Sequence, residues 1–260
     1  MSVLALDSLR ATIDALCSDE EDARYDALDA LEEITDAGAL DGLAEDSTST
    51  LLSLVADEDL DVSVAVIELV GRTRFARAID ALVERAEREQ KSNPRCYTQR
   101  PFHAAIEAIA RCAPGDPRVL ACLTEKLRSI PEVLFRQSTI RALMVVGRTN
   151  AAARDALVAL CESAEEWERV QARWALFGID GDAPSHVPAL VASLGSKSRG
   201  EAVSGAALLA LRDIGAPALP ALDEAAKLKG AQGRAAKELA AMIRSGKSPV
   251  DASLSVRGDS

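Results

Sequence analysis

Aromatic residues are scarce in this sequence: Phe, Trp and Tyr make up 3% of the 260 residues, although 48% of the residues are hydrophobic. The apolar content is therefore mostly Ala, Leu, Val and Ile, residues that pack closely between helices. Gly and Pro fall mostly where periodic segments end, as at Gly71, Pro117 and Gly147. A core of small aliphatic residues favours helices over sheets.

Long apolar runs are also missing, because no stretch of roughly eighteen uncharged apolar residues occurs. The start MSVLALDSLR carries Asp7 and contains no basic leader followed by an apolar run, so we expect no targeting segment. The five cysteines are scattered and form no C-x-x-C pair, which argues against a disulfide framework and a zinc site. These absences predict a soluble, cytoplasmic protein with reduced thiols and no membrane partner.

Signatures of catalysis are absent as well. The two histidines, His103 and His186, lie far apart in the sequence, so a histidine-rich metal site is excluded by their number. No G-x-S-x-G, Walker A, G-x-G-x-x-G or H-E-x-x-H motif occurs. We therefore expect a protein that is not an enzyme and has no catalytic residues, no cofactor and no metal.

One segment has the ligand spacing of a calcium loop, with oxygen-bearing side chains at Asp57, Asp59, Asp61, Ser63 and Glu68. The sixth position of such a loop needs Gly for a sharp turn, but it is Val62 in this sequence. The same residues precede an expected helix, where Asp is a common N-terminal cap. The helix cap is the favoured interpretation.

Charge is unevenly distributed along the chain, which is acidic overall with a net charge of −11. Residues 1–70 hold nineteen acidic and two basic residues, a net charge of −17. Residues 71–148 hold eight acidic and fifteen basic residues, a net charge of +7, and the remainder is close to neutral. This asymmetry suggests oriented docking of a charged partner, while the overall acidity makes nucleic acid an unfavourable partner.

A short frame of residues recurs along the whole chain at intervals of roughly 29 to 42 residues. The frame reads FRQSTIRALMVVG at 135–147, and similar copies are ARYDALDALEEIT, ERVQARWALFGID and VSGAALLALRDIG. Within one copy, Ala172, Ala175 and Leu176 share one helical face, which must be buried against neighbouring helices. Periodic apolar segments between the copies, such as 119–127 and 156–164, predict the first helix of each pair.

The frame resembles the second helix of HEAT repeats, of the short bacterial and archaeal kind related to phycobilin lyases. The resemblance implies an all-α, right-handed α-solenoid of about seven antiparallel helical hairpins, similar to armadillo-type arrays. It covers residues 1–244. Residues 245–260 are polar and turn-rich, so we expect a disordered tail.

The second helices of HEAT-like arrays line a concave groove, so side chains opposite the core stripe should face a partner. On this basis we predict partner-binding residues at Arg100, His103, Arg141, Met144, Trp167, Val170, Trp174 and Phe177. The basic, aromatic segment 91–101 adds a secondary loop contact at Arg95 and Tyr97. The alternative for Trp167 and Trp174 is a structural role under a neighbouring helix.

These observations predict a non-catalytic adaptor or scaffold that binds another protein in the groove. A first alternative is a HEAT-like DNA-binding protein or alkylbase DNA glycosylase that uses the basic middle repeats. A second alternative, implied by the resemblance alone, is a tetrapyrrole-handling protein similar to the lyases. Retention on DNA or heparin at physiological salt separates the first alternative from the adaptor hypothesis.

Overall fold

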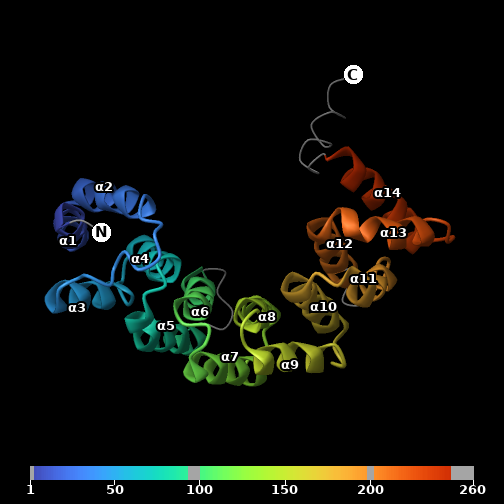
Figure 1. Cartoon of the computed structure of the whole chain (residues 1–260), viewed down its shortest axis with the longest axis horizontal. Coiled ribbons are helices and arrows are strands. Elements are labelled where there is room, and N and C mark those ends of the chain that lie inside the picture. Colours follow the sequence, from blue (N-terminus) through green and yellow to red (C-terminus); the bar gives the residue numbers. More distant parts are fainter. Residues whose placement is uncertain (1–2, 93–99, 198–201, 247–260) are drawn as a thin grey trace, which may run out of the picture. The chain divides into compact units, whose positions relative to one another are not determined.

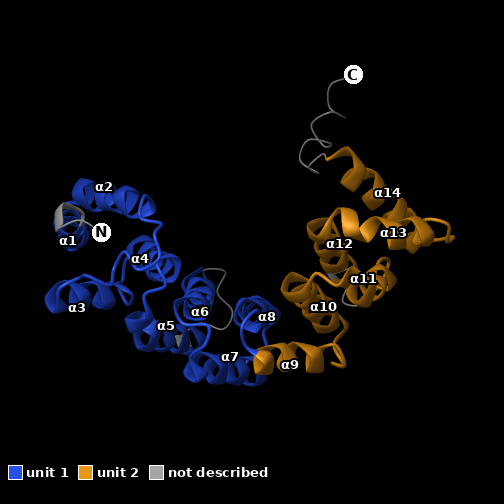
Figure 2. Cartoon of the chain, viewed as in Figure 1, with its two compact units in different colours: residues 1–150 blue, residues 151–260 orange. Residues whose placement is uncertain are grey.

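The computed structural model describes residues 3–92, 100–197 and 202–246, and the regular structure in these ranges is helical throughout. Within them, fourteen α-helices form seven consecutive hairpins, each made of a first and a second helix in contact (Figure 1). This succession confirms the predicted all-α fold class and the hairpin repeat that the resemblance implies. The chain divides into two compact units, residues 1–150 and residues 151–260 (Figure 2).

Unit 1 contains four of these hairpins. Its first helices are α1 (Val3–Leu16), α3 (Glu45–Leu54), α5 (Ile79–Ser92) and α7 (Pro117–Ser129). Its second helices are α2 (Glu21–Glu32), α4 (Leu60–Arg72), α6 (Arg100–Cys112) and α8 (Val133–Gly147). The second helices pack against one another in series, α2 on α4, α4 on α6 and α6 on α8, and therefore form one layer.

Unit 2 contains the other three hairpins. Its first helices are α9 (Ala151–Leu160), α11 (Ala183–Ala192) and α13 (Leu219–Ala225), and its second helices are α10 (Glu166–Asp180), α12 (Ala202–Ile214) and α14 (Ala231–Ser245). The 3₁₀ helices η1 (Ala76–Ala78) and η2 (Ala216–Ala218) precede α5 and α13. Pro217 lies in the 3₁₀ turn η2, which leads directly into α13.

Local sequence accounts for the ends of several helices. Asp116 caps α7 by accepting a hydrogen bond from the backbone N–H of Arg118, and Pro117 occupies the first turn, where no N–H is needed. Asp59 caps α4 by accepting from the N–H of Asp61 at 2.9 Å. The segment with calcium-loop spacing thus begins a helix, and Ser63 is buried with its hydroxyl donating to the Val55 carbonyl.

The core consists of the predicted stripes of small and branched aliphatic residues. On α10, Ala172 and Ala175 are completely buried and Leu176 nearly so. Helices α4 and α6 approach closely at Gly71, where an added Cβ would lie 2.9 Å from both Cα and Cβ of Ala108. Small residues at these positions allow the axes of neighbouring second helices to come close together.

Arginines of the second helices satisfy the free carbonyl groups at the ends of nearby helices. Arg136 on α8 donates to the carbonyls of Leu127 and Ile130 near the end of α7. Arg169 on α10 donates in the same way to the carbonyls of Ser163 and Ala164 beyond α9, at 2.6 and 3.1 Å. Because the last carbonyls of a helix have no partner within it, these contacts tie each second helix to its own first helix.

The predicted boundary between the repeat array and the tail, at residues 244 and 245, lies near the C-terminal limit of the described residues. Ser245 ends α14, and residues 247–260 of the predicted tail lie outside the described part of the chain. The single array over residues 1–244 stays a prediction. None of the described helices is by itself long and apolar enough to cross a membrane, although the bent pair Val203–Ile214 and Ala216–Ala225 passes that test by length and composition.

Candidate functional site

Among the described residues, the second helices of unit 1 share one side on which side chains are exposed or half-buried. On α8, Leu134 and Arg141 are exposed and lie two turns apart, with half-buried Gln137 and Met144 on the same side. The corresponding residues of α2, α4 and α6 are also exposed or half-buried. We call this surface the unit 1 strip; it comprises Asp22, Tyr25, Asp29, Glu32, Asp61, Ala65, Glu68, Arg72, Arg100, His103, Ala104, Glu107, Arg111, Leu134, Gln137, Arg141, Met144 and, directly after α8, Arg148.

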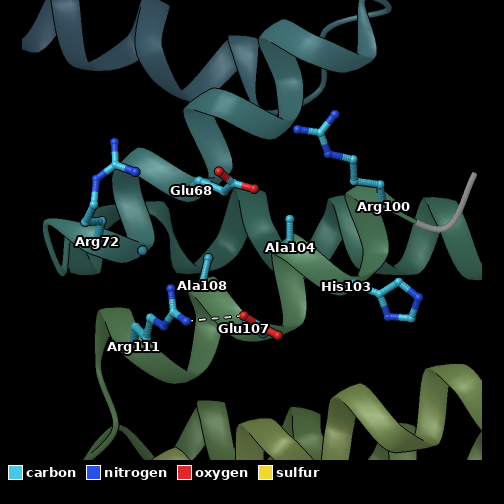
Figure 3. A pocket seen from close by; sticks show the side chains of 9 residues that line it. Glu68, Arg72, Arg100, His103, Ala104, Glu107, Ala108 and Arg111 are labelled. Carbon is cyan, nitrogen blue, oxygen red and sulfur yellow. Dashed lines mark hydrogen bonds and ion pairs between the residues drawn. The ribbon is translucent and has the colours of Figure 1, made fainter. Parts of the chain in front are cut away.

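A pocket of about 270 Å³ lies in the middle of the unit 1 strip, between α4 and α6 (Figure 3). Small residues line it where the helices meet: Gly71, Ala104 and Ala108. Charged and polar side chains surround them, namely Glu68 and Arg72 from α4 and Arg100, His103, Glu107 and Arg111 from α6. The close approach of α4 and α6 at Gly71 therefore leaves small residues at the bottom of the pocket, with charged side chains around its opening.

The charged side chains around the pocket are held by partners within unit 1. Arg100 pairs with Asp61 of α4 at 3.1 Å, and Arg111 pairs with Glu107 one turn earlier on α6 at 3.2 Å. Arg72 donates to the carbonyls of Leu31 and Ile34 at the end of α2, both at 2.9 Å. These contacts fix the positions of the guanidinium groups around the opening.

His103 connects the pocket to α8. Its Nδ1 lies 2.5 Å from the hydroxyl of Ser138, and its ring stacks on Phe135 with centroids 5.9 Å apart. Burial, together with the positive charge of Arg141, lowers the pKa of His103, while Glu107 acts in the opposite direction. The imidazole is therefore mostly neutral at pH 7, and it lines the pocket as an uncharged polar group.

The structure brings four of the predicted partner-binding residues onto the unit 1 strip. Arg100 and His103 line the pocket, and Arg141 and Met144 lie on α8 beside it in the layer. Arg72, Arg111 and Glu68 also line the pocket but were absent from the predicted set. Glu68 and Glu107 lie at equivalent positions of the frame, and Arg72 and Arg111 follow them by one helical turn on the same side of each helix. Continuing the frame by one turn would therefore have predicted both arginines.

Two of the predicted residues lie in unit 2 and are buried: Trp167 has an exposed fraction of 6% and Val170 one of 2%. Val170 nevertheless contributes to the lining of a pocket of about 260 Å³ between α10 and α11. Helix α10 packs against α9, α11 and α12. In the described part of the chain, no residue of α10 before Asp180 is exposed.

Trp174 and Phe177 are half-buried on the same helix. The indole Nε1 of Trp174 donates to the Asp213 carboxylate of α12 at 2.7 Å, so this tryptophan links two neighbouring second helices. This contact agrees with the structural interpretation that the sequence left open for the tryptophans. The predicted loop contacts Arg95 and Tyr97 lie outside the described residues.

The acidic residues with calcium-loop spacing are engaged in protein contacts. The Asp59 carboxylate accepts from the guanidinium of Arg24 at 3.1 Å, and Asp61 pairs with Arg100. Across the described residues, no group of three or more His, Cys, Asp or Glu side chains could hold a metal ion.

No family model matches the sequence, and no curated protein matches it. Among solved structures, the chain is similar to the complex of CpcE and CpcF of phycocyanin lyase from Nostoc sp. PCC7120, with 17% identity over 90% of this chain and 94% of that chain and a TM-score of 0.47. It is also similar to human deoxyhypusine hydroxylase, with 18% identity over 94% and 98% of the two chains and a TM-score of 0.39. A designed armadillo repeat protein shows 18% identity over 90% and 99%, with a TM-score of 0.42. Similarities this low carry no argument about activity or partners.

Proposed function

We propose that this chain is a non-catalytic adaptor that binds a partner protein through the unit 1 strip. The observation that carries the proposal is the combination, on four consecutive second helices, of exposed apolar side chains with charged side chains around a central pocket. Tyr25 on α2 and Leu134 on α8 are 52% and 56% exposed, which is high for residues of their size. Aromatic residues, Met and Arg are enriched at the centres of protein interfaces, and the unit 1 strip contains all three.

The pocket suits recognition better than chemistry. Its floor of Gly71, Ala104 and Ala108 can accept a small apolar side chain, and the surrounding ion pairs can orient the main chain of a bound segment. The His103 ring is held by Ser138 and Phe135, so it presents a fixed polar edge to a bound segment. Partner binding in a groove with a polar rim is typical of helical repeat arrays.

The nucleic-acid alternative receives less support from the geometry. Four acidic residues of the unit 1 strip, Asp22, Asp29, Glu32 and Glu68, are exposed and would repel a phosphate backbone. A glycosylase would need both Trp167 and Trp174 to be accessible to DNA, but Trp167 is buried. The tetrapyrrole alternative rests on a resemblance alone and finds no further observation in its favour.

A photo-cross-linking experiment tests the proposal. A photoreactive amino acid replaces Gln137 on the unit 1 strip, and a matched control carries it at Ala121, an exposed residue on the first helix of the same hairpin. We expect a discrete adduct from position 137 only, and we expect Leu134→Asp to weaken binding of the purified partner by about tenfold or more. Equal adducts from both positions, or an affinity unchanged by Leu134→Asp, would remove the unit 1 strip from the model.

A further inference from the structure

We infer that the segment bound by the unit 1 strip carries opposite charges at its two ends, with a basic end over α2 and an acidic end over α8. This inference rests on the proposed function, and it specifies the chemistry of the partner. It follows from how charge is distributed across the four second helices of a single compact unit.

The α2 end of the unit 1 strip is acidic. Asp22, Asp29 and Glu32 are all exposed there. The one basic residue of α2, Arg24, is turned toward the next hairpin, where it pairs with Asp57 and Asp59 at 3.7 and 3.1 Å. The exposed ring of Tyr25 lies among these acids, and an aromatic face beside carboxylates is suited to a Lys or Arg side chain.

The α8 end is basic. Helix α8 contains no Asp or Glu between Val133 and Gly147. Arg141 is exposed on it, and Arg148 is exposed directly after its end. The exposed Leu134 on the same helix adds apolar area, so an acidic segment with one aliphatic residue matches this end.

The two middle helices are balanced in charge. Asp61 of α4 pairs with Arg100 of α6, and Glu107 pairs with Arg111. Between these pairs lies the small-residue floor of the pocket. The middle of the unit 1 strip therefore selects a bound segment by its shape, and the two ends select it by charge.

The spacing of the helices sets the length of the segment. Packed helix axes lie about 8–10 Å apart, so the three steps from α2 to α8 span about 24–30 Å. An extended chain covers about 3.3 Å per residue, which places the two charged blocks roughly seven to nine residues apart. This distance exceeds the Debye length of about 8–10 Å at physiological salt, so each end should act independently.

Labelled peptides of about twelve residues test the inference by fluorescence anisotropy on the full chain at about 0.05 M salt. One peptide carries a lysine block and a glutamate block at its two ends, separated by small neutral residues. The others carry two lysine blocks, two glutamate blocks, or opposite blocks placed close together. We expect the first peptide to bind about tenfold or more tightly than each of the others.

Charge-reversal variants assign the two ends. Asp29→Lys with Glu32→Lys should shift the preference to the peptide with two glutamate blocks, and Arg141→Glu with Arg148→Glu should shift it to the peptide with two lysine blocks. Arg128→Glu, at an exposed position on the first helix α7, is the control and should leave every affinity within about twofold. Helical circular dichroism of each variant establishes that it is folded.

Equal binding of the peptide with opposite blocks and of either uniform peptide would overturn the inference, as would an unchanged preference in both double variants. Tightest binding of a DNA oligonucleotide would overturn it in favour of a phosphate backbone. If the peptide with opposite blocks shows no preferential binding while the photoreactive residue at position 137 still cross-links one partner, the inferred charge pattern is wrong and the proposed adaptor function stands. If position 137 also gives no specific adduct, the proposed adaptor function is wrong as well.

Discussion

Gly71 is a residue at which α4 and α6 pack closely. A Cβ at this position would lie 2.9 Å from the Cα and Cβ of Ala108, so Gly71→Ala forces α4 and α6 apart. We expect the variant to lose about 1–3 kcal/mol of unfolding free energy, measured by urea denaturation, because overpacking outweighs the better helix propensity of alanine.

Gly205 on α12 provides the matched control for this substitution. It is exposed, and no atom lies within 4 Å of an added Cβ. Gly205→Ala should therefore raise the unfolding free energy by about 0.5–1 kcal/mol. Equal effects of the two substitutions would show that the close approach at Gly71 does not exist in solution.

His103 predicts a pH dependence of stability. Burial and Arg141 lower its pKa below the ordinary value of 6.5, so above that pH both folded and unfolded chains carry a neutral ring. As the pH falls below 6.5, the unfolded chain takes up the proton before the folded chain does, and the unfolding free energy decreases. The decrease ends once the pH is below the pKa of the folded state.

The variant His103→Gln isolates this contribution. We expect its urea midpoint to fall less than that of the wild type between about pH 7.5 and 5, because the titrating ring has been removed. The carboxylates titrate in both proteins, so they cancel in the comparison. Parallel pH profiles would mean that His103 is open to solvent.

Single residues also show where prediction from sequence stops. The frame placed Arg141 opposite the buried stripe of α8, because 100° per residue fixes which side chains oppose that stripe, and Arg141 is exposed. The same rule placed Trp167 and Val170 outward on α10, yet both are buried. Helical periodicity predicts on which side of its helix a side chain lies. Whether that side is buried depends on how neighbouring hairpins pack, which the frame does not describe.

At the scale of the element, the capping arginines make a testable contribution. Arg169 donates to the carbonyls of Ser163 and Ala164 in the segment between α9 and α10, at 2.6 and 3.1 Å. We expect Arg169→Gln to lower the unfolding free energy by about 1–2 kcal/mol, within the range for hydrogen bonds to charged groups at half-buried positions.

Arg169→Lys should recover little of this loss, because an ammonium group cannot reproduce the planar fork that bonds two carbonyls. Arg212→Gln on α12, an exposed site, is the control and should change stability by less than about 0.5 kcal/mol. Thermal denaturation of the three variants checks the order. Full recovery with lysine would assign the effect to charge rather than to geometry.

The helices themselves were largely predictable. The frame at 135–147 falls within α8, and the periodic segment at 119–127 falls within α7. Helix α1 (Val3–Leu16) contains none of the apolar segments named for the first helices, although the array predicted over residues 1–244 spans it. The pocket between α4 and α6 could not be predicted either, since it depends on how closely Gly71 allows two helices of different hairpins to approach.

At the scale of the whole molecule, the distribution of charge is the dominant feature. Residues 1–70 hold nineteen acidic and two basic residues, and these residues make up the first two hairpins of unit 1 apart from the end of α4. Like charges confined to so small a volume repel one another, and this repulsion destabilises the folded state. Exposed ion pairs such as Arg24 with Asp59 offset little of it.

Salt should therefore stabilise this protein. Raising the ionic strength from about 0.01 M to 0.1 M shortens the Debye length from about 30 Å to 10 Å, which screens the repulsion among the acids of α1–α4. We expect the midpoint of thermal unfolding to rise by about 2–4 °C, equivalent to about 1 kcal/mol for a chain of this size. Asp22→Asn with Asp29→Asn and Glu32→Gln should raise the midpoint at low salt and reduce its dependence on salt. A midpoint that instead falls as salt is added would mean that ion pairs such as Arg24 with Asp59 outweigh the repulsion among the acids of α1–α4, which would contradict the prediction.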